Sequence, residues 1–359
     1  MNAVTERVTD IVRVDRENPD AEAIARAASC LRRGGLVAFP TETVYGLGVH
    51  ALDRAAVRRL FDAKGRPAND PLIVHVASFD QIAALVESIP PHAYALAARF
   101  WPGPLTLVMR RSSVVPDEVT AGLETVAIRI PSHPVARALL LAAGMPIAAP
   151  SANLFSRPSP TRASHVHDDL GGRIDMILDG GPTDVGVEST VLDLAREEPA
   201  ILRPGAVTAE MLQAVVPRLG ASSTRPADDE PLRSPGLLSK HYSPRAPLTL
   251  YEGAPEAALQ ALVAEAGRQT GAHRRIGILG TRDQLARVRT VIGEASRAWH
   301  LEDIGDTSSE TATRLYASLR AMDAAGVDLI LVIAGPAEGL GVAVQDRLRR
   351  AAAGRIVHC

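Results

Sequence analysis

Lysine is almost absent from this chain, and one of its two lysines stands beside an arginine. Of the 39 basic residues only Lys64 and Lys240 are lysines, and Arg66 follows Lys64 two positions later. An ammonium and a guanidinium this close repel each other unless an anion lies between them, and a phosphate or carboxylate ligand would supply it. A solvated helix C-terminus would also accommodate both cations. We expect an exposed loop, in which replacing either residue by alanine costs ~0.5 kcal/mol or less.

Further polar groups follow predicted strands. The run Thr41–Thr43 comes directly after the apolar GLVAF, and Ser151 and Asn153 close the segment PIAAPSAN. Two more groups are Glu188–Thr190 in DVGVESTVLDL and Arg203 in ILRPG. Open α/β sheets present ligand groups at the ends of strands, and small hydroxyl and amide groups suit phosphate oxygens. Each group alone would fit a structural turn, but together with the cations they predict a nucleotide site.

Several familiar sites are excluded or weakly supported. A Walker P-loop needs Gly-Lys before Ser or Thr, but Ala63 precedes Lys64 and Ser239 precedes Lys240. The histidines form no HExxH and no Cys–Cys–His spacing suits zinc, so we expect no metal site built by the protein. The segment Gly46–Ala51 resembles a truncated dinucleotide fingerprint, and a nicotinamide oxidoreductase is therefore one alternative.

The elements that must position these residues form a mixed pattern over residues 1–219. The sequence predicts helices at 21–31, behind an Asp20 N-cap, and at 53–61, and Ser78–Gln81 has the pattern of a capping box that opens another helix. Strands are predicted at 35–39, 72–76, 105–109, 126–130, 146–149, 174–178, 189–194 and 200–202. Short strands with helices between them indicate one mixed α/β sheet.

The rest of the chain differs in pattern. Residues 220–247 lack a hydrophobic period and are rich in Pro, Ser and Gly, which is typical of a linker or a functional loop. After them, strands are predicted at 248–251, 275–280 and 327–333, with helices at 256–268, from the capping box Thr307–Glu310 to 324, and at 343–353. Repeated strand–helix units predict a smaller doubly wound domain with a parallel sheet over residues 248–359.

Composition agrees with a globular protein. The net charge is −2, and residues 1–218 carry 22 basic against 25 acidic residues, which is not the basic excess of a nucleic-acid binder. The opening segment has charges throughout and no apolar core of signal-peptide length, and no apolar run is long enough for a membrane span. Cys30 and Cys359 suit reduced thiols. We therefore expect a cytoplasmic location and no membrane partner.

The motifs in order resemble one known family. Lys64 and Arg66 as KxR, Ser151 and Asn153 as SxN, and the segments PTETVYGLG, FWPGPLT, VAIRIPSHP, GGPTDVGVESTVLD and ILRPG are similar to the YrdC-type threonylcarbamoyl-AMP synthases. The segment SPGLLSKHYSP resembles the linker of the longer, two-domain members. The resemblance covers almost the whole chain and implies a YrdC-like twisted sheet followed by a smaller Rossmann-like domain.

The resemblance also implies a reaction and its residues. The reaction is synthesis of L-threonylcarbamoyladenylate from L-threonine, bicarbonate and ATP, with release of pyrophosphate, for threonylcarbamoyladenosine modification of tRNA. Lys64 and Arg66 would be the catalytic residues. The threonine site would comprise Thr43, His75, Arg129, Ala149 and Ser189. ATP would be bound by Lys64, Arg66, Thr125, Ser151, Asn153, Ser159, Arg203 and Tyr242. Without the resemblance, His75 in LIVHV would be interpreted as a core histidine.

Cofactors and partners follow from the same resemblance. Mg²⁺ is expected to bind mainly through the ATP phosphates, and proteins of a downstream tRNA-modification transferase would take the adenylate. A weak tRNA contact is one further expectation, and an RNA-binding module without catalysis is the alternative function. We also predict that Ser234–Pro244 closes over bound ATP as a lid and places Tyr242 against the nucleotide, the alternative being a tether.

Overall fold

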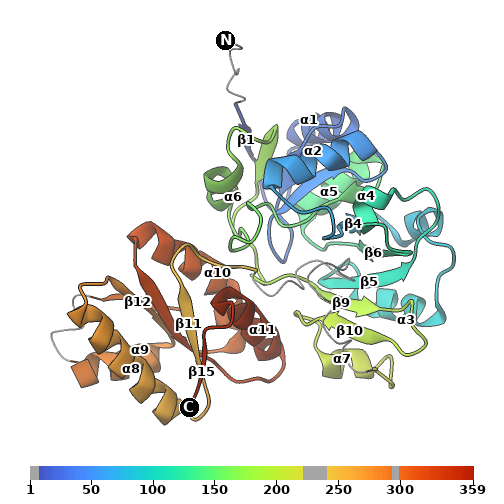
Figure 1. The fold of residues 1–359 in the computed structure, drawn as a ribbon. Helices are drawn as coiled ribbons and strands as arrows, with labels where there is room; N and C mark the ends of the chain where they lie inside the picture. The colour runs from blue at the N-terminus through green and yellow to red at the C-terminus, as the bar shows by residue number, and fades with distance from the viewer. Residues whose placement is uncertain (1–7, 221–240, 293–298) are drawn as a thin grey trace. The chain divides into compact units, whose positions relative to one another are not determined.

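The computed structural model describes residues 8–220, 241–292 and 299–359 of the chain (Figure 1). The chain forms two compact units. The first comprises residues 1–155 and 159–237, and the second comprises residues 156–158 and 238–359. The predicted lid Ser234–Pro244 lies outside the described residues except for its last four positions.

The first unit is built on a ten-stranded mixed sheet, as expected, with strand order β1-β8-β2-β3-β7-β4-β6-β5-β9-β10. Neighbouring strands are parallel in the pairs β1/β8, β8/β2, β4/β6 and β5/β9, and the other neighbours are antiparallel. The strands are β1 (Asp10–Arg13), β2 (Val37–Phe39), β3 (Gly46–His50), β4 (Ile73–His75), β5 (Leu105–Arg110), β6 (Thr125–Arg129), β7 (Ile147–Ala148), β8 (Met176–Asp179), β9 (Thr190–Asp193) and β10 (Ala200–Arg203).

Helices cover both faces of this sheet. One core packs beneath α1 (Ala21–Arg32) and α5 (Pro134–Ala143). The larger core packs beneath α2 (Arg54–Lys64), α3 (Pro91–Phe100), α4 (Asp117–Thr120), α6 (Ala163–Leu170) and α7 (Ala209–Gln213). The apolar residues of α1 recur every three or four positions, which places them on one side of the helix. The predicted Asp20 N-cap is confirmed, because its side chain accepts from the backbone N–H of Ala23 at 2.8 Å.

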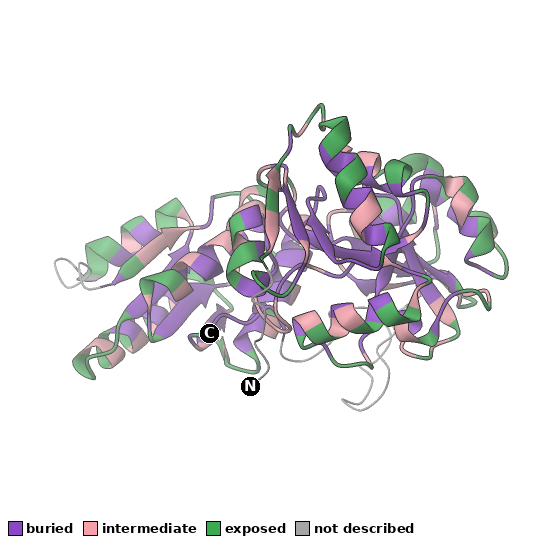
Figure 2. Ribbon diagram, turned by 90° about the horizontal axis from the view of Figure 1, so that it is seen from above, coloured by how far each residue is buried: buried purple, intermediate pink, exposed green. Residues whose placement is uncertain are grey.

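The second unit has a five-stranded parallel sheet of order β13-β12-β14-β11-β15, which confirms the expected fold class. Its strands are β11 (Leu248–Glu252), β12 (Ile276–Gly280), β13 (His300–Asp303), β14 (Leu329–Ile333) and β15 (Ile356–His358). Its helices are α8 (Pro255–Gly271), α9 (Arg282–Ile292), α10 (Ser308–Ala325) and α11 (Leu340–Ala352). The predicted capping box is confirmed at the start of α10, where Thr307 and Glu310 bond reciprocally. In Figure 2 the strands are largely buried and the helices carry exposed outer faces.

One alternative interpretation and one local prediction are wrong. Gly46–His50 forms β3, antiparallel to β2, whereas a dinucleotide fingerprint requires a loop that opens a helix. Gly48 is needed for packing, since a Cβ there would meet the ring of Phe39 at 2.8 Å. The expected capping box at Ser78 does not form, because Phe79–Ala84 is a 3₁₀ helix and the side chain of Ser78 caps nothing. Gln81 instead accepts from the backbone N–H of Ala77 at 2.8 Å.

Candidate active site

Side chains alternate between the two faces of the first sheet along the adjacent strands β4, β6, β5 and β9, and this places polar side chains on one face. Ile73, Val108, Ala127 and Val191 form a small apolar cluster on the face opposite the larger core. Side chains two positions apart on a strand share a face. His75, Thr106, Arg129 and Ser189 are each two positions from a member of this cluster and therefore project from the same face.

Arg129 is the centre of a buried network on this face. Its guanidinium donates to Oγ1 of Thr43 at 2.9 Å and forms an ion pair with Glu42 at 2.8 Å. Its Nε donates to the carbonyl of Gly103 at 3.2 Å. Burial acts to raise the pKa of Glu42, but the charge of Arg129 and its hydrogen bond outweigh burial and hold the pKa below its usual value. The structure therefore brings Thr43 and Arg129 together and adds a carboxylate to them.

His75 lies at the end of β4, beside Arg129 at the end of the parallel β6. Its Nδ1 lies 3.2 Å from the carbonyl of Ile73. Burial, with the positive charge of Arg129, lowers the pKa of His75 to about 3, so the ring is neutral at physiological pH. Ala149 directly follows β7, and its backbone N–H donates to the same carbonyl of Ile73 at 2.9 Å.

Ser189 joins the two predicted substrate sets. Its hydroxyl lies 2.8 Å from that of Thr106. Arg203 donates from its guanidinium to the Ser189 hydroxyl at 3.2 Å and from Nε to the Ser189 carbonyl at 3.1 Å. A residue assigned to threonine and one assigned to ATP are therefore in direct contact, as neighbouring subsites of one reaction require.

The expectation that Lys64 and Arg66 lie in an exposed loop is wrong. Lys64 is 1% exposed and Arg66 is 7% exposed. Lys64 ends α2, and its ammonium donates to the backbone carbonyls of Ser151 and Asn153. The structure therefore joins the KxR motif to the SxN motif. Burial and the nearby charge of Arg66 lower the pKa of Lys64 well below its usual value.

Arg66 faces an acidic residue that the motifs of the sequence do not include. Its guanidinium forms an ion pair with Asp70 at 2.9 Å and donates to the carbonyls of Asp70 and Pro71, at 3.1 and 2.8 Å. Burial raises the pKa of Asp70, and the charges of Arg66, Lys64 and Arg203 oppose that rise. In the sequence, the signal for this contact was that Asp70 lies four positions after Arg66. In a loop, such spacing does not by itself predict a contact.

The remaining predicted ATP residues lie in different surroundings. Ser159 is fully buried and donates to Glu188 at 2.5 Å. Thr125 begins β6 and Arg129 ends it, so they are four positions apart, roughly 13 Å along the strand. Any ligand that contacts both must extend along β6. Tyr242 belongs to the second unit.

The ring of Tyr242 is buried within that unit. It packs against Tyr316, with ring centroids 5.4 Å apart, and the guanidinium carbon of Arg347 lies 5.5 Å from its centroid. Its backbone φ is +60°, an uncommon value for a residue other than glycine. The placement of Tyr242 against ATP stays a prediction.

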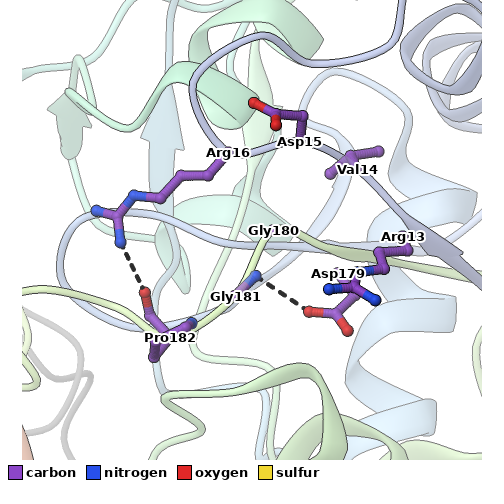
Figure 3. A pocket seen from close by; sticks show the side chains of 8 residues that line it. All are labelled: Arg13, Val14, Asp15, Arg16, Asp179, Gly180, Gly181 and Pro182. Atoms are coloured by element: carbon purple, nitrogen blue, oxygen red, sulfur yellow. Dashed lines mark hydrogen bonds between the residues drawn. The ribbon is translucent and has the colours of Figure 1, made fainter.

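A separate cleft of about 670 Å³ opens where β1 and β8 end. Figure 3 shows its lining by Arg13–Arg16 and by Asp179–Pro182, with Arg16 donating to the carbonyl of Pro182 at 3.1 Å. Its lining includes none of the predicted site residues. Among the described residues, no group of three or more His, Cys, Asp or Glu side chains is arranged to hold a metal ion.

Comparison with known proteins gives the chain a family. A family model described as "Telomere recombination" matches residues 29–205, and one described as "Threonylcarbamoyl-AMP synthase, C-terminal domain" matches residues 207–353. The threonylcarbamoyl-AMP synthase of Pyrococcus abyssi is 44% identical over 98% of this chain and 99% of its own length. The chain belongs to the threonylcarbamoyl-AMP synthase family. The Bacillus subtilis member is 46% identical over 93% of this chain and 94% of its own length.

The fold agrees with this membership. A crystal structure of P. abyssi Sua5 complexed with L-threonine superposes with a TM-score of 0.90 at 42% identity, covering 98% of this chain and 100% of the other. The chain is an enzyme of this family, and the alternative of an RNA-binding module without catalysis is set aside. In the part of the chain that the structure describes, no helix is long and apolar enough to cross a membrane.

Proposed function

We propose that this enzyme makes L-threonylcarbamoyladenylate from L-threonine, bicarbonate and ATP, releasing pyrophosphate. The observation that carries the proposal is the contact between Arg203 and Ser189, in which a residue assigned to ATP lies against a residue assigned to threonine. The related P. abyssi Sua5 forms a crystalline complex with L-threonine, which supports the amino-acid half of the proposal.

In this reaction the threonine amine first attacks the carbon of bicarbonate. An N–C bond forms as a C–O bond of bicarbonate breaks and water leaves, which gives an N-carboxylate. One oxygen of that carboxylate then attacks the α-phosphorus, a new P–O bond forms, and the bond to the β-phosphate oxygen breaks as pyrophosphate leaves. Both reactants are anions, so catalysis depends on holding them in line and on fixed positive charge. No covalent nucleophile is needed.

Threonine is proposed to bind around Arg129, whose guanidinium suits its carboxylate. Glu42 forms an ion pair with one nitrogen of that guanidinium, and this ion pair fixes the orientation of Arg129. Thr43, His75 and Ser189 supply hydroxyl and imidazole groups for the substrate hydroxyl. Because His75 is neutral, it adds no positive charge there. The role of the Ala149 backbone stays a prediction from the family resemblance.

ATP is proposed to bind through Lys64, Arg66 and Arg203. All three cations are nearly fully buried, so their attraction for phosphate is screened less than at a surface. Ser151, Asn153 and Ser159 would orient the nucleotide, and Thr125 and Tyr242 would contact its more distant parts. Mg²⁺ is proposed to arrive with ATP as the metal–nucleotide substrate, held mainly by phosphate oxygens.

The product would pass to proteins of a tRNA-modification transferase, since a mixed anhydride of this kind is readily hydrolysed. Direct contact with tRNA and a cytoplasmic location stay predictions from the family resemblance and the composition.

The proposal is tested by measuring pyrophosphate release from MgATP with threonine or bicarbonate omitted in turn. We expect release only when both are present. Release that is independent of threonine would contradict the proposal, and salt-sensitive tRNA binding without ATP turnover would restore the binding-module alternative.

A further inference from the structure

Asp70 is a fully buried carboxylate that engages the arginine assigned to ATP. Its relative exposure is 0%, and Oδ1 lies 2.9 Å from the guanidinium of Arg66. Arg66 also donates to the backbone carbonyls of Asp70 and Pro71. The guanidinium is thus turned onto the segment that immediately follows it.

This carboxylate is held by charge rather than by hydrogen bonds. Within the described part of the chain, neither oxygen of Asp70 has a hydrogen bond of good geometry. The positive charges of Arg66, Lys64 and Arg203 all act on it. Burying a carboxylate in this way is costly. The arrangement is therefore poorly explained as a device for stability, since an apolar residue would avoid that cost.

The cations supply another reason. Buried positive charges repel one another when nothing neutralises them, and a buried arginine without an anion is strongly destabilising. An empty phosphate site needs a negative charge that a filled site does not need, because the triphosphate then supplies several.

We propose that Asp70 is an exchangeable counter-ion, which neutralises the phosphate-binding cations while the site is empty and loses Arg66 to the phosphates of ATP. This inference rests on the proposed function, since it takes ATP to be the anion that replaces the carboxylate. Phosphate forms stronger, bidentate bonds with a guanidinium than a single carboxylate oxygen does. Anions that bind weakly cannot displace Asp70, so the ion pair also favours polyphosphate over them.

The exchange predicts an unusual result for Asp70→Asn, which removes the charge and keeps the shape. Without ATP, the variant should be less stable than the parent chain, because Arg66 loses its ion pair with Asp70. The same variant should bind ATP more tightly, because no ion pair has to be broken. A residue with only a structural role would not give a gain in affinity.

The experiment is calorimetric titration of the full chain with a non-hydrolysable ATP analogue and Mg²⁺, without threonine, beside thermal unfolding with and without the analogue. For Asp70→Asn we expect Kd to fall by about threefold or more and the ligand-induced rise in Tm to exceed that of the parent chain. Glu118→Gln is the matched control. Glu118 also pairs with two arginines, Arg58 at 2.6 Å and Arg54 at 3.3 Å, outside the predicted site, so that variant should keep the parental Kd.

An unchanged or higher Kd for Asp70→Asn, with the parent chain binding the analogue, would overturn the exchange and leave the proposed function standing. Failure of the parent chain to bind the analogue would overturn both. If Asp70→Asn is unfolded alone, circular dichroism should show that the analogue or inorganic pyrophosphate restores folding, because either one supplies the missing charge. Failure of that rescue would also overturn the exchange.

Discussion

The two sheets of this enzyme bury polar groups in different places. In the first unit, Arg129, His75 and Ser189 lie on or directly beside strands and project from one sheet face. In the second unit, the adjacent strands β12 and β14 contain only Gly, Ile, Leu and Val, and the buried Arg320 and Arg347 lie on helices. Strands with one polar face hold side chains in fixed positions, whereas strands that are apolar on both faces contribute a packed core.

The largest expected effect is selection between threonine and valine by the polar face of the first sheet. A substrate without a hydroxyl would offer no partner to the hydroxyl and imidazole groups of Thr43, His75 and Ser189, which we assign to the substrate hydroxyl. We expect kcat/KM for valine to be lower by about 10⁴ or more, with serine rejected less strongly than valine. Steady-state pyrophosphate release with each amino acid measures this ratio. Equal use of threonine and valine would mean that the polar face does not read the substrate.

The next effect is the loss of stability when one core leucine is replaced in each unit. Leu107 in β5 and Leu331 in β14 are both 0% exposed, so replacing either by alanine should cost about 2–5 kcal/mol in the free energy of unfolding. Leu107 directly follows Thr106, which contacts Ser189. We therefore expect Leu107→Ala to lower kcat of the folded enzyme and Leu331→Ala to leave it unchanged. Denaturant unfolding measures the loss of stability, and turnover at low temperature measures kcat of the folded variants. Equal losses of kcat in both variants would show that the two cores do not differ in their effect on the site.

Lys64→Ala and Arg66→Ala are each expected to lower turnover at least tenfold, about 1.4 kcal/mol in the activation free energy. Since both side chains are buried and hydrogen-bonded, each variant should also lose stability, by about 1–3 kcal/mol. Pyrophosphate release and thermal unfolding measure the two effects. Near-parental release by either variant would show that its cation does not act on phosphate.

The last effect is a pH dependence of stability carried by His75. Its folded pKa of about 3 lies below the ordinary 6.5, so the unfolded chain binds more protons between these values. The free energy of unfolding should therefore rise with pH across this window, by at most ~1.4 kcal/mol per pH unit. The stability gained in this way is lost again as the pH falls toward the folded pKa. His75→Asn should reduce that slope in denaturant unfolding at pH 4 to 6. An identical slope would indicate that His75 is protonated in the folded chain.

Local signals in the sequence predicted the helices and strands better than they predicted which charged side chains are buried and paired. The capping box of α10 and the apolar run of β14 are contained within a few residues, so pattern alone identifies them. The strand β3 was missed because Gly46 and Gly48 suggest a loop, whereas the second glycine is required by the ring of Phe39 packed against it. Such a requirement arises only from tertiary structure.

The same reason explains the errors at the site. Lys64 and Arg66 are hydrophilic residues at a helix end, and no local feature shows that the SxN loop folds over the ammonium. The motifs predict which residues take part. The counter-ions Asp70 and Glu42 become apparent only when the chain brings them against Arg66 and Arg129.

We propose that the polar face of the first sheet joins threonine, bicarbonate and ATP into one adenylate. The most direct measurement supplies the full chain with MgATP, threonine and ¹³C-bicarbonate and analyses the rapidly quenched products by mass spectrometry. We expect an adenylate that contains threonine and one ¹³C atom, formed in equal amount to pyrophosphate before hydrolysis. Pyrophosphate without a labelled adenylate, or ADP in its place, would contradict it.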